Sequence, residues 1–125
     1  MRRFALAATL LLALAACGYT TDDVRQQPPR WSALYPRPWQ DVTNCIASAQ
    51  WPSYQVTPIM FAAEQRATVT AATVLQGYSS SVWIYDIRAT GAGAEVTWRA
   101  RPAYIDIAGM ETNAHQIADR CGGRI

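Results

Sequence analysis

Two alternating segments joined by a glycine-bearing loop constrain the fold of this chain more than any other feature. Residues 82–88 and 95–101 flank residues 89–94 (Ala-Thr-Gly-Ala-Gly-Ala), which supply a turn. From residue 85 to 88 and from 95 to 101, apolar and polar side chains alternate with the period of two typical of β-strands. A turn at the Ala92–Gly93 bond predicts the cross-strand pairs Tyr85/Ala100, Ile87/Trp98, Ala89/Val96, Asp86/Arg99 and Arg88/Thr97. This register separates an apolar face from a polar one, and a one-residue slip would mix them. The sequence therefore predicts an antiparallel hairpin with one buried face.

Further strands and two helices are expected around this hairpin. Residues 66–78 are rich in Thr and Val and predict a third strand, while 55–61 and 103–108 are weaker strand candidates because Pro58 and Pro102 limit them. Two apolar stripes at helical spacing predict helices over 39–50 and 111–120, and they consist of Val42, Cys45, Ile46 and Ala49, and of Ala114, Ile117, Ala118 and Cys121. Each apolar stripe must be buried against another element, and the apolar face of the sheet is available for this. We therefore predict an α+β fold, a two-layer sandwich with an antiparallel sheet of three to four strands and an N-terminal and a C-terminal helix on one face, forming a single domain over 31–125.

The N-terminus has the layout of an export signal. Arg2 and Arg3 precede an apolar run from Phe4 to Ala16, which is shorter than the roughly 20 residues that a membrane-spanning helix needs. The run ends in Leu14-Ala15-Ala16-Cys17, which resembles the lipobox of bacterial lipoproteins. The resemblance implies cleavage after residue 16 and attachment of diacylglycerol and an acyl chain to Cys17. An ordinary secretory signal followed by a cysteine is the alternative.

The resemblance also implies a location. Residue 18 is Gly rather than the Asp that retains enterobacterial lipoproteins in the inner membrane, so the expected place is the periplasmic face of the outer membrane. Residues 17–30 are polar with a Pro-Pro pair and are interpreted as a lipidated tether. Loss of Arg2 and Arg3 with the signal leaves nine Arg against nine acidic residues, and this neutral balance gives no argument for nucleic-acid binding.

If Cys17 is lipidated, two cysteines remain, Cys45 and Cys121. In an oxidising periplasm such a pair usually forms a disulfide, which we predict here. Two buried free thiols, or a redox or metal pair, are the alternatives. The spacing of 76 residues differs from the Cys-x-x-Cys of catalytic pairs.

The segment Trp31–Trp39 combines aromatic residues with prolines. It either fastens its aromatic rings onto the domain or forms a partner-docking strip, for which Trp31, Tyr35 and Trp39 are the candidate residues. The five tryptophans could also stack on sugars, although such residues more often fill a small core.

The sequence gives little support for catalysis or for a bound cofactor. His115, Glu111 and Asp119 fall at helical spacing, and a shared metal ion is conceivable, but a solvated polar face is the simpler interpretation. Ser79-Ser80-Ser81 lack a nucleophile elbow, and residues 91–93 do not precede a helix as a phosphate loop does. We expect no enzyme activity, no catalytic or metal site and no cofactor.

The expected function is that of a non-enzymatic, membrane-anchored lipoprotein, an accessory or binding module of an envelope protein complex. The alternative is an inhibitor of a cell-wall-degrading enzyme, similar to the lipoprotein inhibitors of lysozyme. Residues 90–94 are a loose match to the loop of those inhibitors, and the two expected helices differ from their all-β fold.

Overall fold

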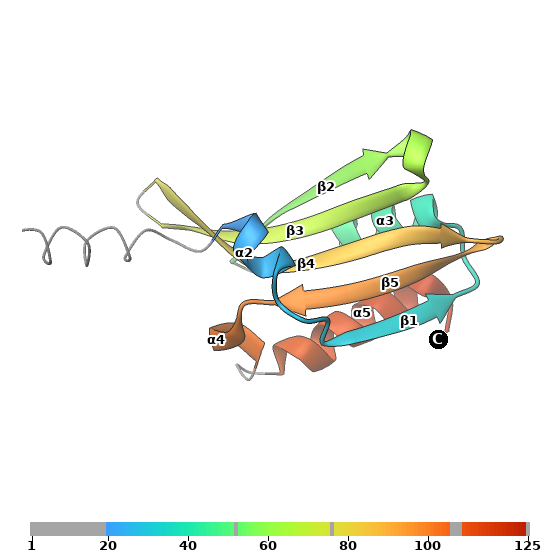
Figure 1. The fold of residues 1–125 in the computed structure, drawn as a ribbon. Coiled ribbons are helices and arrows are strands. Elements are labelled where there is room, and N and C mark those ends of the chain that lie inside the picture. Colours follow the sequence, from blue (N-terminus) through green and yellow to red (C-terminus); the bar gives the residue numbers. More distant parts are fainter. Residues whose placement is uncertain (1–19, 52, 76, 106–108, 125) are drawn as a thin grey trace, which may run out of the picture.

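The computed structural model describes residues 20–51, 53–75, 77–105 and 109–124. Within these ranges the fold is α+β, with one antiparallel sheet of five strands in the order β1-β5-β4-β3-β2 (Figure 1). The strands are β1 (Trp31–Tyr35), β2 (Gln55–Phe61), β3 (Arg66–Leu75), β4 (Tyr78–Thr90) and β5 (Gly93–Ala100). The helices are α2 (Thr21–Arg25), α3 (Trp39–Ser48), α4 (Pro102–Ile105) and α5 (Met110–Gly122), with a 3-10 turn at Ala62–Glu64.

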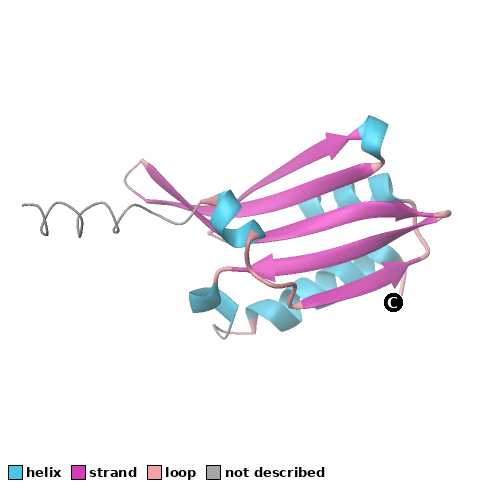
Figure 2. Ribbon diagram, viewed as in Figure 1, coloured by secondary structure: helices cyan, strands magenta, loops and turns pink. Residues whose placement is uncertain are grey.

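The predicted helices lie together on one face of the sheet. Figure 2 shows α3 and α5 behind the strands, and both contribute to the core that fills this interface. Trp83, Tyr85 and Ile87 of β4 and Val96 and Trp98 of β5 point into the same core, each at most 1 % exposed. The hydroxyl of Tyr85 donates a hydrogen bond of 2.7 Å to the carbonyl oxygen of Ala114, which ties the centre of the sheet to α5.

The Cys45–Cys121 disulfide is confirmed. It joins α3 to α5 with a Cα–Cα distance of 5.5 Å. Both cysteines lie on the stripes that face the sheet, so the bridge connects two helices that share one core.

The hairpin has the predicted faces, but its register is wrong by two residues. Tyr85 lies opposite Trp98, and Thr90 opposite Gly93, so the chain turns at Gly91–Ala92. Gly91 has φ +57°, as the first central position of a two-residue type II′ turn requires. Gly93 serves packing instead, because a Cβ there would lie 2.1 Å from the carbonyl oxygen of Tyr35. A shift of two keeps every side chain on its face.

The sheet has five strands instead of the three to four predicted, and the strand that the prediction lacks is β1 at the edge. Residues 31–35 pair with β5 from Trp31/Trp98 to Tyr35/Ala94. The strand predicted over 103–108 is also wrong, since residues 102–105 form the short helix α4 and 106–108 lie outside the described residues. Proline is tolerated in the first turn of a helix, where its missing N–H costs nothing. The weak strand candidate over 55–61 is confirmed as β2.

The interpretation of residues 17–30 as a tether is wrong for residues 21–25, which form α2. Thr20 and Asp23 make a capping box at its start, and Val24 is only 1 % exposed. This helix contacts β4 and β5 on the face opposite α3 and α5 (Figure 1), where Ile84 is buried. The structured chain thus extends to within three residues of Cys17, which itself lies outside the described residues.

Candidate functional site

The edge of the sheet formed by β1 runs beside α5. Three polar contacts join this region to α5 and the residues after it: Arg30 with Glu111 at 3.1 Å, the Tyr35 hydroxyl with Asp119 Oδ1 at 2.7 Å, and Arg124 Nη2 with the Leu34 carbonyl oxygen at 2.9 Å. Between these contacts lie two adjoining hollows of about 320 and 360 Å³, which meet at His115. We call them together the β1–α5 groove, and its principal lining residues are Trp31, Ser32, Leu34, Glu111, His115, Asp119 and Arg124.

The three predicted docking residues have different positions. Tyr35 is 3 % exposed and Trp39 6 %, so both rings belong to the core and neither offers a surface to a partner. Trp31 is half-buried and borders the groove. The strip therefore fastens its aromatic rings to the domain, with Trp31 alone of the three remaining as a docking candidate.

Tyr35 fixes the spacing between β1 and α5. Its ring lies against Gly122, where an added Cβ would be 2.2 Å from ring atoms, and the Arg124 guanidinium lies over the ring at 4.9 Å from its centroid. Burial, and secondly the hydrogen bond to Asp119, raise the pKa of the Tyr35 hydroxyl. The phenol therefore remains a hydrogen-bond donor at neutral pH.

This raised pKa predicts a loss of stability in alkali. In the unfolded chain tyrosine ionises near pH 10, while in the folded protein Tyr35 still holds its proton, so stability is full below about pH 10 and falls as pH rises further. The Tyr35→Phe variant should be less stable at pH 7 by about 1 kcal/mol, because one hydrogen bond is lost. Above about pH 10 it should lose less stability than the wild type.

Urea unfolding between about pH 7 and about pH 11 measures this difference. Burial also raises the pKa of Tyr85, so some alkaline sensitivity should remain in the Tyr35→Phe variant. Identical pH profiles for the two proteins would contradict the assignment to Tyr35.

An aromatic platform forms the middle of the groove. The rings of Trp31 and His115 stack with centroids 4.3 Å apart and an interplanar angle of 13°. His115 Nε2 lies 3.7 Å from Asp119 Oδ1, and the Asp119 carboxylate already accepts the Tyr35 hydroxyl. Glu111, His115 and Asp119 thus line one face, as their spacing predicts, and they do so along the groove.

Ser32 is the hydroxyl-bearing residue that β1 contributes to the groove. The Ser32 hydroxyl lies 2.7 Å from the Thr97 hydroxyl, and these two residues are cross-strand neighbours. Among the described residues no group of three His, Cys, Asp or Glu side chains could hold a metal ion. What the groove offers is a stacked aromatic surface, the three carboxylates of Glu95, Glu111 and Asp119, and the arginine Arg124.

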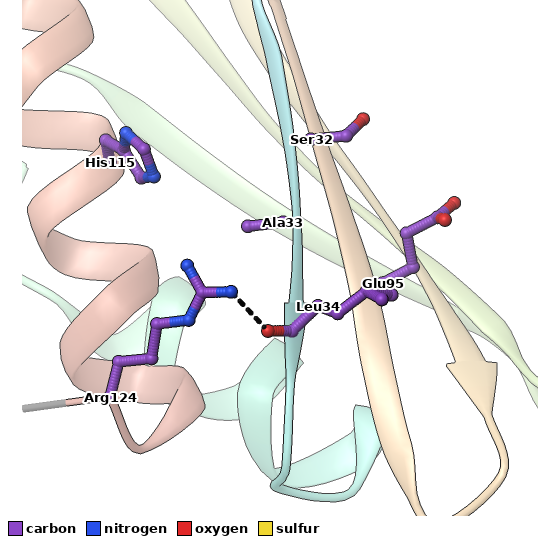
Figure 3. A pocket seen from close by; sticks show the side chains of 6 residues that line it. All are labelled: Ser32, Ala33, Leu34, Glu95, His115 and Arg124. Carbon is purple, nitrogen blue, oxygen red and sulfur yellow. Dashed lines mark hydrogen bonds between the residues drawn. The ribbon is translucent and has the colours of Figure 1, made fainter.

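The backbone of β1 is open along its outer edge, because no described strand pairs with that side. Figure 3 shows Arg124 reaching from the C-terminal end of α5 to the Leu34 carbonyl oxygen. Since the N–H and C=O of one residue in an antiparallel strand point the same way, Ser32 and Leu34 direct their backbone groups outward. Leu34 is also 59 % exposed.

Sequence reasoning missed this edge and the contribution of Arg124. The alternation of Trp31-Ser-Ala-Leu-Tyr35 is the available signal, since its odd positions are the ones that turn inward. The proximity of Arg124 to Leu34 has no signal in the sequence, because it depends on how α5 crosses the sheet.

Comparison with known proteins yields no relationship: no family model, no curated protein and no solved structure matches the chain. In the described part of the chain, none of the helices has the length and apolar character required to cross a bilayer.

Proposed function

We propose that this protein is a non-enzymatic lipoprotein, anchored through Cys17 to the periplasmic face of the outer membrane, that binds an extended segment of an envelope protein along the β1–α5 groove. The anchor is supported by the charge, the apolar run and the Leu14-Ala15-Ala16-Cys17 motif. The binding mode is supported by the open edge of β1, whose outward carbonyl at Leu34 is met by a side chain instead of a strand.

Strand addition explains the features of the groove together. An extended peptide that pairs with Ser32 and Leu34 gains main-chain hydrogen bonds, and its alternate side chains reach pockets on either side. Side chains on the helix side would rest on the Trp31–His115 platform near Glu111 and Asp119, which favours apolar or cationic residues. Arg124 would release Leu34 as the peptide pairs, and the Arg124 side chain is about half exposed.

The opposite edge of the sheet is less suited to strand addition. The middle of β2 contains Pro58, which has no N–H to donate, and proline is a common means of blocking exposed edges. Ile59 on β2 is 45 % exposed and lies on the same face of the sheet as Leu34. It therefore gives a matched control position at the other edge.

Site-specific photocrosslinking tests the proposed binding edge. A photoreactive side chain at Leu34 or at Ile59 is introduced into the full-length protein in bacterial cells, and adducts are recovered from solubilised envelopes. We expect an envelope-protein adduct at Leu34, attached within an extended segment of the partner, and none at Ile59. Adducts at Ile59 alone, or at neither edge, would contradict the proposal.

A second variant tests the backbone contribution. The Leu34→Pro substitution removes one outward N–H while keeping the inward ladder with β5, as proline on an edge strand can. Loss of one hydrogen bond, about 1 kcal/mol, should weaken binding of the crosslinked segment, made as a peptide, by roughly fivefold. The His115→Ala variant should also weaken binding, because it halves the platform. Unchanged affinity in both variants would place the peptide elsewhere.

The inhibitor alternative is not favoured. The loop that it would use is a tight two-residue turn at Gly91–Ala92, and Gly93 is in β5.

A further inference from the structure

The N-terminal helix brings the anchor close to one end of the sheet. The Thr21 hydroxyl lies 3.0 Å from the Ser81 hydroxyl at the beginning of β4, and buried Val24 holds the helix in place. Only residues 18 and 19 separate Cys17 from Thr20, and three residue steps span at most about 11 Å. If Cys17 carries lipid, as the proposed function states, the bilayer surface must therefore lie close to this end of the domain.

The tip of the β3–β4 hairpin is at the same end. Tyr78 precedes Ser81 by three residues, and Figure 1 shows the β3–β4 hairpin projecting past α2, away from the β4–β5 turn. Tyr78 is 81 % exposed and Val74 55 %. Among the described large hydrophobic side chains, Tyr78 is the most exposed, and Val74 is one of the most exposed aliphatic ones.

These two side chains lie on opposite faces of the hairpin. Val74 pairs with Ser79, and Leu75 pairs with Tyr78, so Val74 and Tyr78 alternate across the ribbon. A strand of an antiparallel sheet with one face on the core and the other in water commonly carries polar side chains on the solvated face. The tip of this hairpin carries apolar side chains on both faces, and no described helix covers either face. Such a tip is suited to insertion into an apolar environment that surrounds it, and not to lying flat on a surface.

We propose that the β3–β4 tip, meaning Val74, Tyr78 and Ser79, enters the interfacial region of the membrane that holds the lipid anchor. Tyrosine is favoured at this depth because its ring is apolar and its hydroxyl can stay hydrated. Arg101 lies next to the base of the hairpin, where its guanidinium donates to the Ser80 hydroxyl at 3.1 Å. In the proposed orientation, this guanidinium lies near the phosphate groups of the lipids. The tip acts as a second, weak contact that orients the domain on its anchor.

Fluorescence quenching tests this orientation on the acylated full-length protein. A polarity-sensitive fluorophore is attached to cysteine in either Ser79→Cys or Ala92→Cys, and the protein is incorporated into phosphatidylcholine vesicles with or without brominated acyl chains. Both positions are small and exposed, and β4, which separates them, is 13 residues long, about 40 Å. Flotation of the vesicles and the mass of the N-terminal peptide report the anchor independently.

We expect brominated lipid to quench the probe at position 79 and to leave the probe at position 92 unaffected. Adding Val74→Ser and Tyr78→Ser should reduce the quenching at 79, while flotation remains unchanged. Floating protein with no quenching at 79, or with stronger quenching at 92, would overturn the orientation and leave the anchor intact. Protein with an unmodified Cys17 that does not float would overturn the anchor, and the orientation with it.

Discussion

Replacing Cys45 and Cys121 together with alanine should lower the free energy of unfolding by about 4 kcal/mol, in the loop-entropy account of a bridge that closes 76 residues. Without the bridge, the unfolded chain gains conformational freedom. The gain is large because the bridge joins α3, which precedes strands β2 to β5, to α5, which follows them. In a domain of this size such a loss corresponds to a fall in melting temperature of about 15–30 °C. Thermal unfolding followed by circular dichroism measures it.

Reduction provides the control for this effect. Wild-type protein in a strong reductant should melt close to the double variant, and the reductant should leave the double variant unchanged. The Cys17→Ser variant should retain the wild-type melting temperature, because the described contacts that form the domain all lie C-terminal to Cys17. A double variant that melts within a few degrees of oxidised wild type would contradict the structural role of the disulfide.

The Trp98→Ala substitution should destabilise the domain by about 3–5 kcal/mol, because it leaves a cavity in the centre of the core. Trp98 is fully buried, lies directly opposite Tyr85 in the sheet and pairs across the other ladder with Trp31. Its ring also stacks on that of Trp31 at a centroid distance of 6.2 Å. The neighbouring helices cannot close the cavity easily, since the disulfide holds them together. Chemical denaturation measures the loss.

Two substitutions show whether ring volume is the cause. The indole Nε1 of Trp98 has no hydrogen-bond partner among the described residues, so Trp98→Phe loses no such bond and should cost much less than Trp98→Ala. Thr97→Ala, on the other face of the same strand, removes the hydroxyl that bonds to Ser32 but no core volume, so it should cost about 1 kcal/mol, well below Trp98→Ala. Equal losses for Trp98→Phe and Trp98→Ala would point to the indole N–H instead of volume.

The sequence predicts the faces of the sheet better than its register. Alternation assigns Tyr85, Ile87, Val96 and Trp98 to the core, and all four are buried. Alternation cannot choose between registers that differ by two residues, because both keep the same faces. The roles of two glycines decide the register: Gly91 supplies the positive φ of the turn, and Gly93 permits the close approach of Tyr35.

Two small elements escape prediction because tertiary contacts stabilise them. A five-residue helix such as α2 is too short to be stable alone, and the burial of Val24 against the sheet accounts for its presence. One signal does exist: Val82, Trp83, Ile84 and Tyr85 are four consecutive apolar residues, and such a run indicates a strand buried on both faces. Ile84 is the residue of this run on the α2 side.

The candidate site is predictable only in part. Residue types and helical spacing place Glu111, His115 and Asp119 on one face, and the aromatic content of residues 31–39 draws attention to Trp31. Whether an aromatic ring of that segment is core or surface depends on the pairing of β1, which buries Tyr35 and leaves Trp31 beside the groove.

Intact-mass and N-terminal peptide mass spectrometry of the protein purified from bacterial membranes tests the lipoprotein assignment most directly. We predict a mature chain that begins at Cys17, carries a diacylglyceryl group on its sulfur and an acyl chain on its amino group, and lacks residues 1–16. The Cys17→Ser variant should fold but carry no lipid and leave the membrane fraction. A mature chain that begins at another residue, or an unmodified Cys17, would contradict the account.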